Sequence, residues 1–192
     1  MTRLAARDAL LSRLCGRAWP EGALLDVIRP GPFHVLDVGA GDGRLRREAW
    51  ARGHAGLFVG VDPHPGPGIL AGRAEALPFH DATFDLALFV RVLAHLPRPE
   101  QALAEARRVL RRGAWITVAE HGPAHLRATW AALGRPATPP RPAPEPTFTI
   151  TVPVTVTAED ARFLRRTYRE PAEVPSHFFP VLDEVQLLVW WR

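Results

Sequence analysis

The chain has 192 residues, 47% of them apolar and 8% aromatic, so it can bury one sizeable core but is too short for two full domains. No window holds the roughly 18 to 20 uninterrupted apolar residues of a membrane span, and charged residues interrupt the N-terminal leucines, so we expect a cytoplasmic protein without a signal peptide or membrane association. The single Cys15 excludes an intramolecular disulfide and a cysteine-rich zinc module, and we expect no bound metal.

All 24 positively charged side chains are arginine, and the net charge is +4. Their only local clusters are the segments "RLRRE" and "RRVLRRG", which we interpret as solvated helix faces. A modest positive field attracts phosphates without specificity, so the charge favours a nucleic acid or another anionic partner only slightly.

The first thirty residues predict two short helices, over residues 2–15 and 20–30, because their apolar positions recur at helical spacing and Pro20 and Pro30 bracket the second one. We interpret residues 1–30 as an N-terminal helical cap. Residues 31–192 would form the main domain.

From Pro32 onward the pattern alternates between strand and helix. Apolar strands are predicted over residues 33–38, 56–62, 84–90 and 114–120, and helices over residues 43–53 and 99–113, the second ending at Gly113 as its C-cap. Strands that are apolar on both faces and separated by helices indicate a mainly parallel sheet that is covered on both sides.

The last third predicts a helix within residues 121–134 and an extended proline-rich loop over residues 135–146. An alternating strand follows over residues 147–156, which Pro153 marks as an edge strand or a bulged one. A helix that begins after Thr157 and a final strand over residues 184–192 complete the chain.

A glycine turn, "DVGAGDG", lies between the first strand and its helix. Gly39, Gly41 and Gly43 allow a ligand to approach the backbone, and the helix that follows presents free N–H groups. Arg44 stands where the dinucleotide fingerprint needs a small residue, so this turn is a poor pyrophosphate site and a nicotinamide oxidoreductase is a distant possibility.

Two acids flank the turn. Asp37 precedes the glycines, where a carboxylate suits the ammonium group of a ligand with an amino-acid end. Asp62 ends the next strand, where an acid accepts hydrogen bonds from a ribose diol. The structural alternative is that both acids only cap strand ends.

The segments "HVLDVGAGDG", "VGVDP" and "GRAEALPFHDATFDLALFVRVLAHLPRPEQALAEARRVLRRGAWITVAE" resemble, in this order, the class I S-adenosylmethionine-dependent methyltransferases of the type 11 subgroup over residues 33–120. The resemblance implies a Rossmann-like α/β fold whose mainly parallel sheet has seven strands, or six if an edge strand is lost, with helices on both faces and an antiparallel C-terminal edge.

The resemblance also implies S-adenosylmethionine as the cofactor and assigns residues to it by position. Asp37, Gly39, Ala40 and Gly41 would surround the methionine end, with Phe89 beside it; Asp62 would hold the ribose, and Arg73 and Ala74 would lie at the adenine.

Three departures from the family pattern stand out. The family has an acid at the position of Arg73, whose side chain carries no acceptor for the adenine amino group; Glu75 is either its substitute or a surface-loop residue. Only "PHPGPGILAG" follows the second strand, which predicts that a helix is missing and the third strand is short. Arg91 stands where it could hold the acceptor substrate or the donor's carboxylate, or simply point to solvent.

These observations predict an enzyme that transfers a methyl group by in-line displacement to a small molecule or to RNA. They assign no catalytic residue, because alignment of the reactants can supply much of the rate, although His95 or His121 could act as a base. The alternative is a non-catalytic binding or regulatory module with a degenerate adenine site. Residues 154–175 also resemble the end of the bacterial 23S ribosomal RNA guanine methyltransferases, and the oligomeric state is left open.

Overall fold

The computed structural model describes residues 2–135, 144–171 and 173–191. The chain divides into two compact units, one built from residues 1–23 and 121–188 and the other from residues 24–120 and 189–192. The division into a cap over residues 1–30 and a domain over residues 31–192 stays a prediction. Most of the predicted proline-rich loop, residues 136–143, lies outside the described residues.

The second unit contains the glycine turn, and we call it the glycine-turn unit. It holds strands β1 (Val35–Val38), β2 (Phe58–Asp62), β3 (Leu70–Ala71), β4 (Phe84–Val90) and most of β5 (Leu110–His121), together with helices α3 (Arg44–Ala51), η1 (Leu93–His95) and α4 (Pro99–Val109). Strand β1 pairs in parallel with β2 and β4, and β4 pairs in parallel with β5. The predicted alternation of strands and helices is confirmed.

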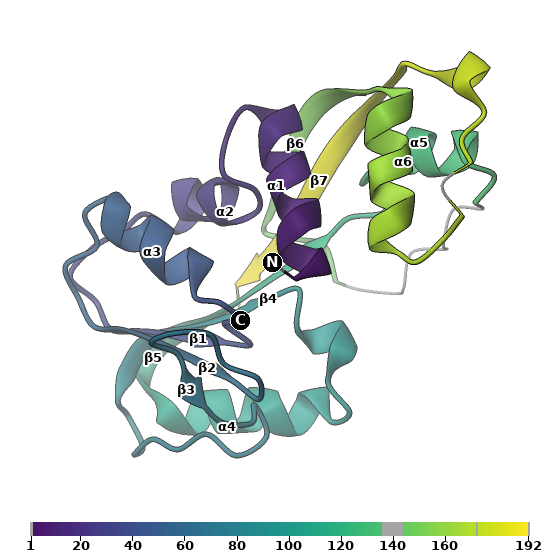
Figure 1. The fold of residues 1–192 in the computed structure, drawn as a ribbon. Coiled ribbons are helices and arrows are strands. Elements are labelled where there is room, and N and C mark those ends of the chain that lie inside the picture. The colour runs from purple at the N-terminus through teal and green to yellow at the C-terminus, as the bar shows by residue number, and fades with distance from the viewer. Residues whose placement is uncertain (1, 136–143, 172, 192) are drawn as a thin grey trace. The chain divides into compact units, whose positions relative to one another are not determined.

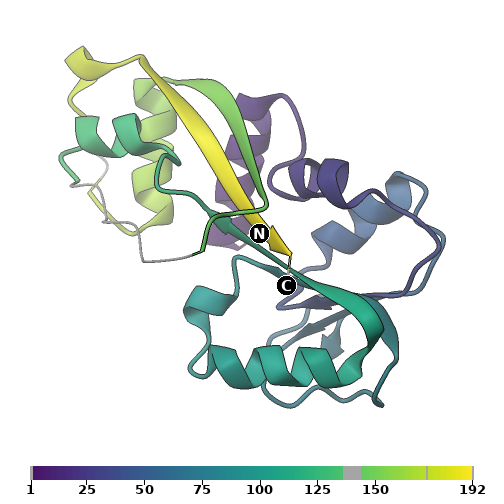
Figure 2. The same cartoon turned by 180° about the vertical axis from the view of Figure 1, so that it is seen from behind.

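Helices α3 and α4 lie on opposite faces of this sheet (Figures 1 and 2). Helix α4 buries Ala102, Leu103, Ala106 and Val109, which recur at helical spacing and therefore form one apolar stripe against the sheet. Because β1, β2 and β4 run in parallel, their carboxyl ends meet at one edge, where ligands bind in open sheets of this kind.

The end of α4 differs from the sequence prediction. The helix stops at Val109, and Leu110 already has an extended backbone with φ −84° and ψ 141°. Gly113 is therefore not the C-cap: it lies in β5 with φ +82°, where the pairing with β4 shifts from Phe84↔Leu110 to Leu86↔Trp115. The shift in register requires a left-handed backbone at this position, a conformation that glycine adopts without steric cost.

The link between β2 and β3 is short, as predicted, with no helix over residues 63–69 and a third strand of two residues. The N–H of Gly66 donates to the carbonyl of Gly41 at 2.9 Å, which fastens the link to the glycine turn. A Cβ atom at position 66 would lie 2.7 Å from Cα of Asp42, so only glycine permits this approach.

The complete sheet has the strand order β3-β2-β1-β4-β5-β7-β6, mostly parallel with an antiparallel C-terminal edge, which confirms the predicted fold. Strand β7 spans Val181–Trp191, and β6 spans Phe148–Val156 at the edge that Pro153 predicts. The remaining helices are α1 (Arg3–Cys15), α2 (Glu21–Ile28), α5 (Arg127–Ala132), α6 (Ala158–Thr167) and η2 (Ser176–Phe178).

In the first unit, α6 begins with the capping box that Thr157 predicts. The side chains of Thr157 and Asp160 each accept a hydrogen bond from the backbone N–H of the other residue. Arg13 of α1 forms an ion pair with Asp160, and Arg7 lies over the ring of Tyr168 at 3.8 Å, so α1 is fixed to α6 at two places. Among the described residues, no helix is long and apolar enough to cross a membrane.

Candidate functional site

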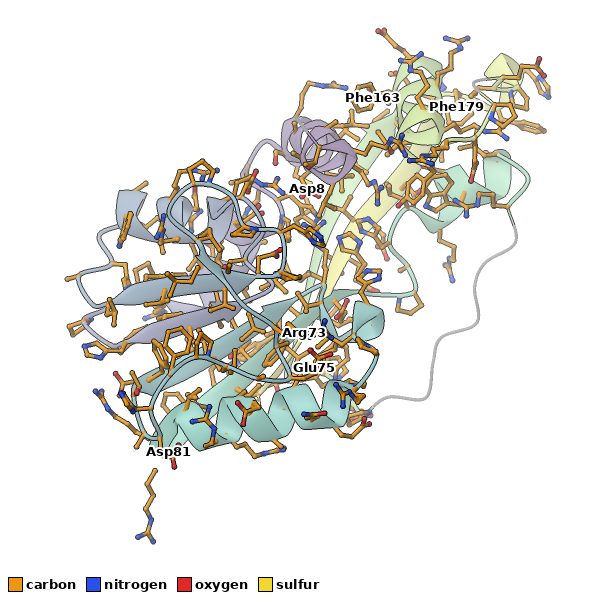
Figure 3. All side chains as sticks on the ribbon, turned by 60° about the horizontal axis from the view of Figure 1, so that its bottom comes forward. Asp8, Arg73, Glu75, Asp81, Phe163 and Phe179 are labelled. Atoms are coloured by element: carbon orange, nitrogen blue, oxygen red, sulfur yellow. The ribbon has the colours of Figure 1, made fainter. Side chains whose placement is uncertain are left out.

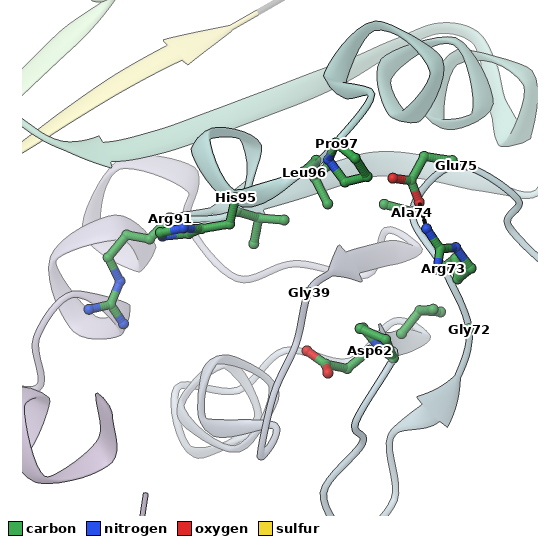
Figure 4. Close-up of a pocket in the computed structure, with 13 residues that line it drawn as sticks. Gly39, Asp62, Gly72, Arg73, Ala74, Glu75, Arg91, His95, Leu96 and Pro97 are labelled. Atoms are coloured by element: carbon green, nitrogen blue, oxygen red, sulfur yellow. Dashed lines mark ion pairs between the residues drawn. The ribbon is translucent and has the colours of Figure 1, made fainter. Parts of the chain in front are cut away.

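A cavity of about 290 Å³ opens where the carboxyl ends of β1, β2 and β4 meet (Figure 4). It lies entirely within the glycine-turn unit. The residues that line it are Gly39, Val61, Asp62, Pro63, Gly72, Arg73, Ala74, Glu75, Arg91, Val92, His95, Leu96 and Pro97. Five of the sequence-predicted site residues, Gly39, Asp62, Arg73, Ala74 and Arg91, are therefore brought together around one space.

Gly39 forms the part of the cavity wall that follows β1. Its backbone has φ +79°, and its N–H donates to the carbonyl of Val61 at 2.8 Å. A Cβ atom at position 39 would lie 2.4 Å from Cγ2 of Val92. Both the backbone angle and the contact with Val92 therefore require glycine here.

Asp62, at the end of β2, connects the cavity to the glycine turn. Its Oδ2 atom accepts the N–H of Gly41 at 2.9 Å, and its Oδ1 atom accepts the N–H of His64 at 2.8 Å. Each carboxylate oxygen has a second lone pair, so the side chain can still accept a hydrogen bond from the hydroxyl of a ligand. Asp62 thus binds backbone N–H groups at the end of β2, as the structural alternative expects, and it also lines the cavity, so its role toward a ligand stays a prediction.

Arg73 and Glu75 form the opposite end of the cavity, and the two side chains face each other (Figures 3 and 4). The Nη2 atom of Arg73 lies 3.6 Å from Oε2 of Glu75. The Arg73 side chain is 62% exposed, whereas that of Glu75 is 4% exposed. The surface-loop interpretation of Glu75 is therefore wrong.

Arg91 follows β4 with a left-handed backbone of φ +58°, and its N–H donates to the carbonyl of Ala119 at 2.7 Å. Its guanidinium extends away from Asp62 and Arg73 (Figure 4). Arg91 thus lines the end of the cavity opposite to Arg73, and its charge acts on Glu120 in the next strand.

Glu120, near the end of β5, is a site residue that the sequence analysis did not identify. Burial raises the pKa of its carboxyl to about 7. The positive charge of Arg91 and hydrogen bonds from the N–H groups of Leu93, Ala94 and Val92 lower this pKa, but by less than burial raises it. Glu120 therefore holds the segment that carries the cavity residues Val92 and His95. An acid at the end of an apolar strand, as in Asp62, is the signal that could have identified it.

Among the described residues, the other predicted site residues lie outside the cavity lining. Asp37 is buried within β1, Ala40 and Gly41 belong to the turn, and Phe89 is fully buried in the core beneath the sheet edge. Their assigned roles toward the donor stay predictions. Of the two candidate bases, His95 lines the cavity, whereas His121 stacks on His125 in the first unit at 3.7 Å.

Comparison with known proteins shows which family this part of the chain resembles. Residues 36–118 match the model of the methyltransferase domain family, a segment that contains the glycine turn, Asp62 and the Arg73–Glu75 end of the cavity. The chain is 36% identical over 131 residues to the ubiquinone/menaquinone biosynthesis C-methyltransferase UbiE of Methylobacterium nodulans. The chain is therefore similar to methyltransferases over residues 36–118, which are less than half of its length.

The similarity of this chain to curated relatives covers only part of each protein. The match to the Methylobacterium protein covers 58% of this chain and 52% of that protein, so the chain spans about half the length of the relatives that it matches. A Burkholderia cenocepacia protein of the same name is 34% identical over 128 residues, with the same coverage.

Solved structures share the fold of this chain over most of its length. The YcgJ protein of Bacillus subtilis superposes with a TM-score of 0.58 at 16% identity, covering 88% of this chain and 95% of that one. The [4+2]-cyclase SpnF superposes with a TM-score of 0.54 at 18% identity, covering 98% of this chain and 92% of that one. The fold alone therefore does not determine the reaction.

Proposed function

We propose that this protein is a methyltransferase, which binds S-adenosylmethionine in the cavity at the sheet edge and transfers its methyl group to a small-molecule acceptor. The single observation that carries the proposal is the convergence of Gly39, Asp62 and Glu75 on one cavity. Each supplies what one part of this donor needs: close backbone approach, an acceptor for hydroxyl groups and an acceptor for an amino group.

The cavity fits the donor by two independent features. Gly39 lines the cavity without a side chain, with Val92 packed where its Cβ atom would lie, and the Oε1 atom of Glu75 is buried without a hydrogen-bond partner among the described residues. Gly39 would lie against the methionine end and Asp62 would hold the ribose. When bound, the donor supplies a methyl carbon that its sulfonium already activates for nucleophilic attack.

The residues of this chain would contribute by positioning. Displacement at a methyl carbon requires the nucleophile in line at about 3 to 3.5 Å, and holding the reactants in this arrangement can supply much of the rate. His95 is the cavity residue that could accept a proton from the acceptor, and Arg91 is the one that could bind an anionic group of it.

A small molecule is the favoured acceptor because the curated relatives are named as C-methyltransferases of ubiquinone and menaquinone biosynthesis. The net charge of +4 favours an anionic acceptor, and RNA is the competing class that the experiment must separate. We also propose a cytoplasmic location and a role without membrane partners.

Calorimetric titration with S-adenosylmethionine and S-adenosylhomocysteine tests donor binding. Wild-type protein should bind both with saturation, whereas Gly39→Arg should lose binding because the new side chain would collide with Val92 and displace this part of the cavity wall. Incubation of the protein with cell extract and methyl-labelled donor then tests transfer, and label in the small-molecule fraction is the expected result. Folded protein that binds neither ligand would overturn the proposal, and label found only in RNA would overturn the acceptor class.

A further inference from the structure

A second cavity, of about 190 Å³, lies within the glycine-turn unit, and we call it the tryptophan cavity. Leu86 of β4 lines it, whereas Arg91, five residues further on, lines the first cavity, and five residues span about 16 Å of extended strand. A ligand in the tryptophan cavity is therefore distant from the donor site proposed above. The lining residues, none of which belongs to the first cavity, are Phe33, Trp115, Trp191, Asp85, Ile28, Leu86 and Thr117.

The tryptophan cavity lies on the face of the sheet opposite to α4. Trp115 and Thr117 of β5 share one face, because alternate residues of a strand do, and Leu86 pairs with Trp115 in the neighbouring strand. Ile116, which lies between them, packs on the other face in the core that contains the buried residues of α4. The indole of Trp115 is therefore directed away from that core.

Two indole rings keep much of their surface open to solvent at this cavity. Trp115 is 62% exposed and Trp191 is 44% exposed, and their rings stack with centroids 6.4 Å apart and 22° between the planes. Large aromatic side chains that stay exposed around a hollow are typical of a binding site. The face of an indole carries a negative potential, so it attracts a cation.

Asp85 adds a negative charge to the cavity wall. Its Oδ2 atom accepts the N–H of His34 at 2.7 Å, and its Oδ1 atom accepts a hydrogen bond from Nη1 of Arg111 at 2.7 Å. These bonds hold the pKa of Asp85 below its ordinary value, so the carboxyl is ionised at neutral pH. Arg111 is outside the lining, and solvent screens its charge because its side chain is 44% exposed. In the part of the chain that the structure describes, Asp85 is the only charged residue of the lining.

The polar atoms at this place suit a cation without N–H groups. A primary ammonium brings three donors, whereas both oxygens of Asp85 already accept a hydrogen bond from the protein. A quaternary ammonium needs no acceptor, and its methyl groups can contact Ile28 and Leu86. We propose that the tryptophan cavity binds the quaternary ammonium group of a small organic cation, held against Trp115 and Trp191 beside the carboxylate of Asp85. This site is independent of the proposed methyl transfer.

The test compares choline with 3,3-dimethylbutan-1-ol, which has the same shape but a neutral carbon in place of the nitrogen. Ligand-observed NMR titration of the full chain measures both affinities. Wild-type protein should bind choline at least about fivefold more tightly, the ratio that a cation–π contribution of about 1 kcal/mol gives. Asp85→Asn should weaken choline binding and leave that of the alcohol unchanged, because only the cation is attracted by the carboxylate.

Trp115→Ala should weaken choline binding at least about fivefold. Trp50→Ala is the matched control, because Trp50 is 50% exposed in the same unit but lines neither cavity, and it should bind choline like the wild type. Unfolding midpoints establish that the variants are folded, and the comparison of the two ligands on wild-type protein needs no variant.

Equal binding of choline and the alcohol to wild-type protein would overturn the inference, since the cavity would then select apolar shape alone. Absence of choline binding would overturn it as well, and so would full choline affinity in folded Trp115→Ala. None of these results bears on the binding of S-adenosylmethionine in the first cavity.

Discussion

The Oδ2 atom of Asp62 accepts a hydrogen bond from the backbone N–H of Gly41 at 2.9 Å, so the acid at the end of β2 is fixed to the glycine turn that follows β1. The same carboxylate accepts the N–H of His64 through Oδ1 and lines the cavity. This carboxylate therefore connects the end of β2 to the turn that follows β1. A substitution of Asp62 should alter both the position of the turn and the binding of the ligand.

Asp62→Asn should weaken S-adenosylhomocysteine binding by at least about tenfold. The amide that replaces the carboxylate has one acceptor oxygen, and hydrogen bonds to a charged acceptor contribute about 1.5 to 3 kcal/mol. Calorimetric titration measures the affinity. Asp81→Asn is the control, because Asp81 is exposed and pairs with Arg108 outside the cavity lining, and it should bind like the wild type. Unchanged affinity in Asp62→Asn would contradict the proposed role of Asp62.

Gly39→Ala should destabilise the protein more than Gly53→Ala. Both glycines have a left-handed backbone, with φ +79° and +84°, and each substitution costs about 1 kcal/mol of backbone strain. Only the alanine at position 39 meets a neighbour, Cγ2 of Val92 at 2.4 Å, and such overpacking costs a further 1 to 3 kcal/mol or so.

Denaturant unfolding of the two variants measures this difference. Val92→Ala removes the clashing methyl groups, so it should lessen the effect of Gly39→Ala and leave that of Gly53→Ala unchanged. Equal destabilisation by the two glycine substitutions would show that the contact with Val92 adds nothing.

Glu120 should make the stability of the protein depend on pH near neutrality. Its pKa is raised from an ordinary value of 4.5 to about 7, so the protonated form is favoured in the folded state. The stability that this group contributes is fully present below about pH 4.5 and is lost as the pH rises through 7. The difference between the two pKa values corresponds to about 3 kcal/mol.

The measurement is the free energy of unfolding of wild-type protein and Glu120→Gln between pH 5 and pH 8. The variant stays neutral throughout, so its advantage over the wild type should grow as the pH rises. A difference that is constant over this range would mean that Glu120 does not titrate there.

Thr157→Ala should lower the free energy of unfolding by about 1 kcal/mol, because the N-terminus of α6 loses the side-chain acceptor of its capping box. Thr157→Ser keeps the hydroxyl and serves as the matched control, with a loss below about 0.5 kcal/mol. Denaturant unfolding followed by circular dichroism compares them. Equal losses in the two variants would indicate that the methyl group of Thr157, and not its hydroxyl, stabilises the helix.

The central strands and the glycine turn could be predicted from the sequence because each carries a local physical signal. Strands β1 and β4 are mostly apolar, and Gly39 and Asp62 lie where β1 and β2 end. Gly113 misled the prediction because a glycine after an amphipathic helix is typical of a C-cap. The chain instead turns into β5 at Leu110, which depends on pairing with β4 and leaves no local trace.

Burial was the part of the site that the sequence could not provide. Glutamate is usually found at the surface, so the sequence gives no sign that Glu75 and Glu120 are buried. Their burial results from the packing of segments that are distant in the chain. The same holds for the contact of Val92 with Gly39, which joins two strand ends 53 positions apart. Such relationships are set by the tertiary structure and not by residue spacing.

The link that fastens Gly66 to the glycine turn sets a limit on how this protein can be altered. Because the N–H of Gly66 donates to the carbonyl of Gly41 and no Cβ atom fits beside Asp42, residues 63–69 should tolerate neither insertions nor side chains at position 66. A deep mutational scan selecting for folded protein would therefore show position 66, although it lies in a surface segment, as intolerant as a position in a core strand. A short surface link without regular secondary structure would thus contain one of the least replaceable positions of the chain.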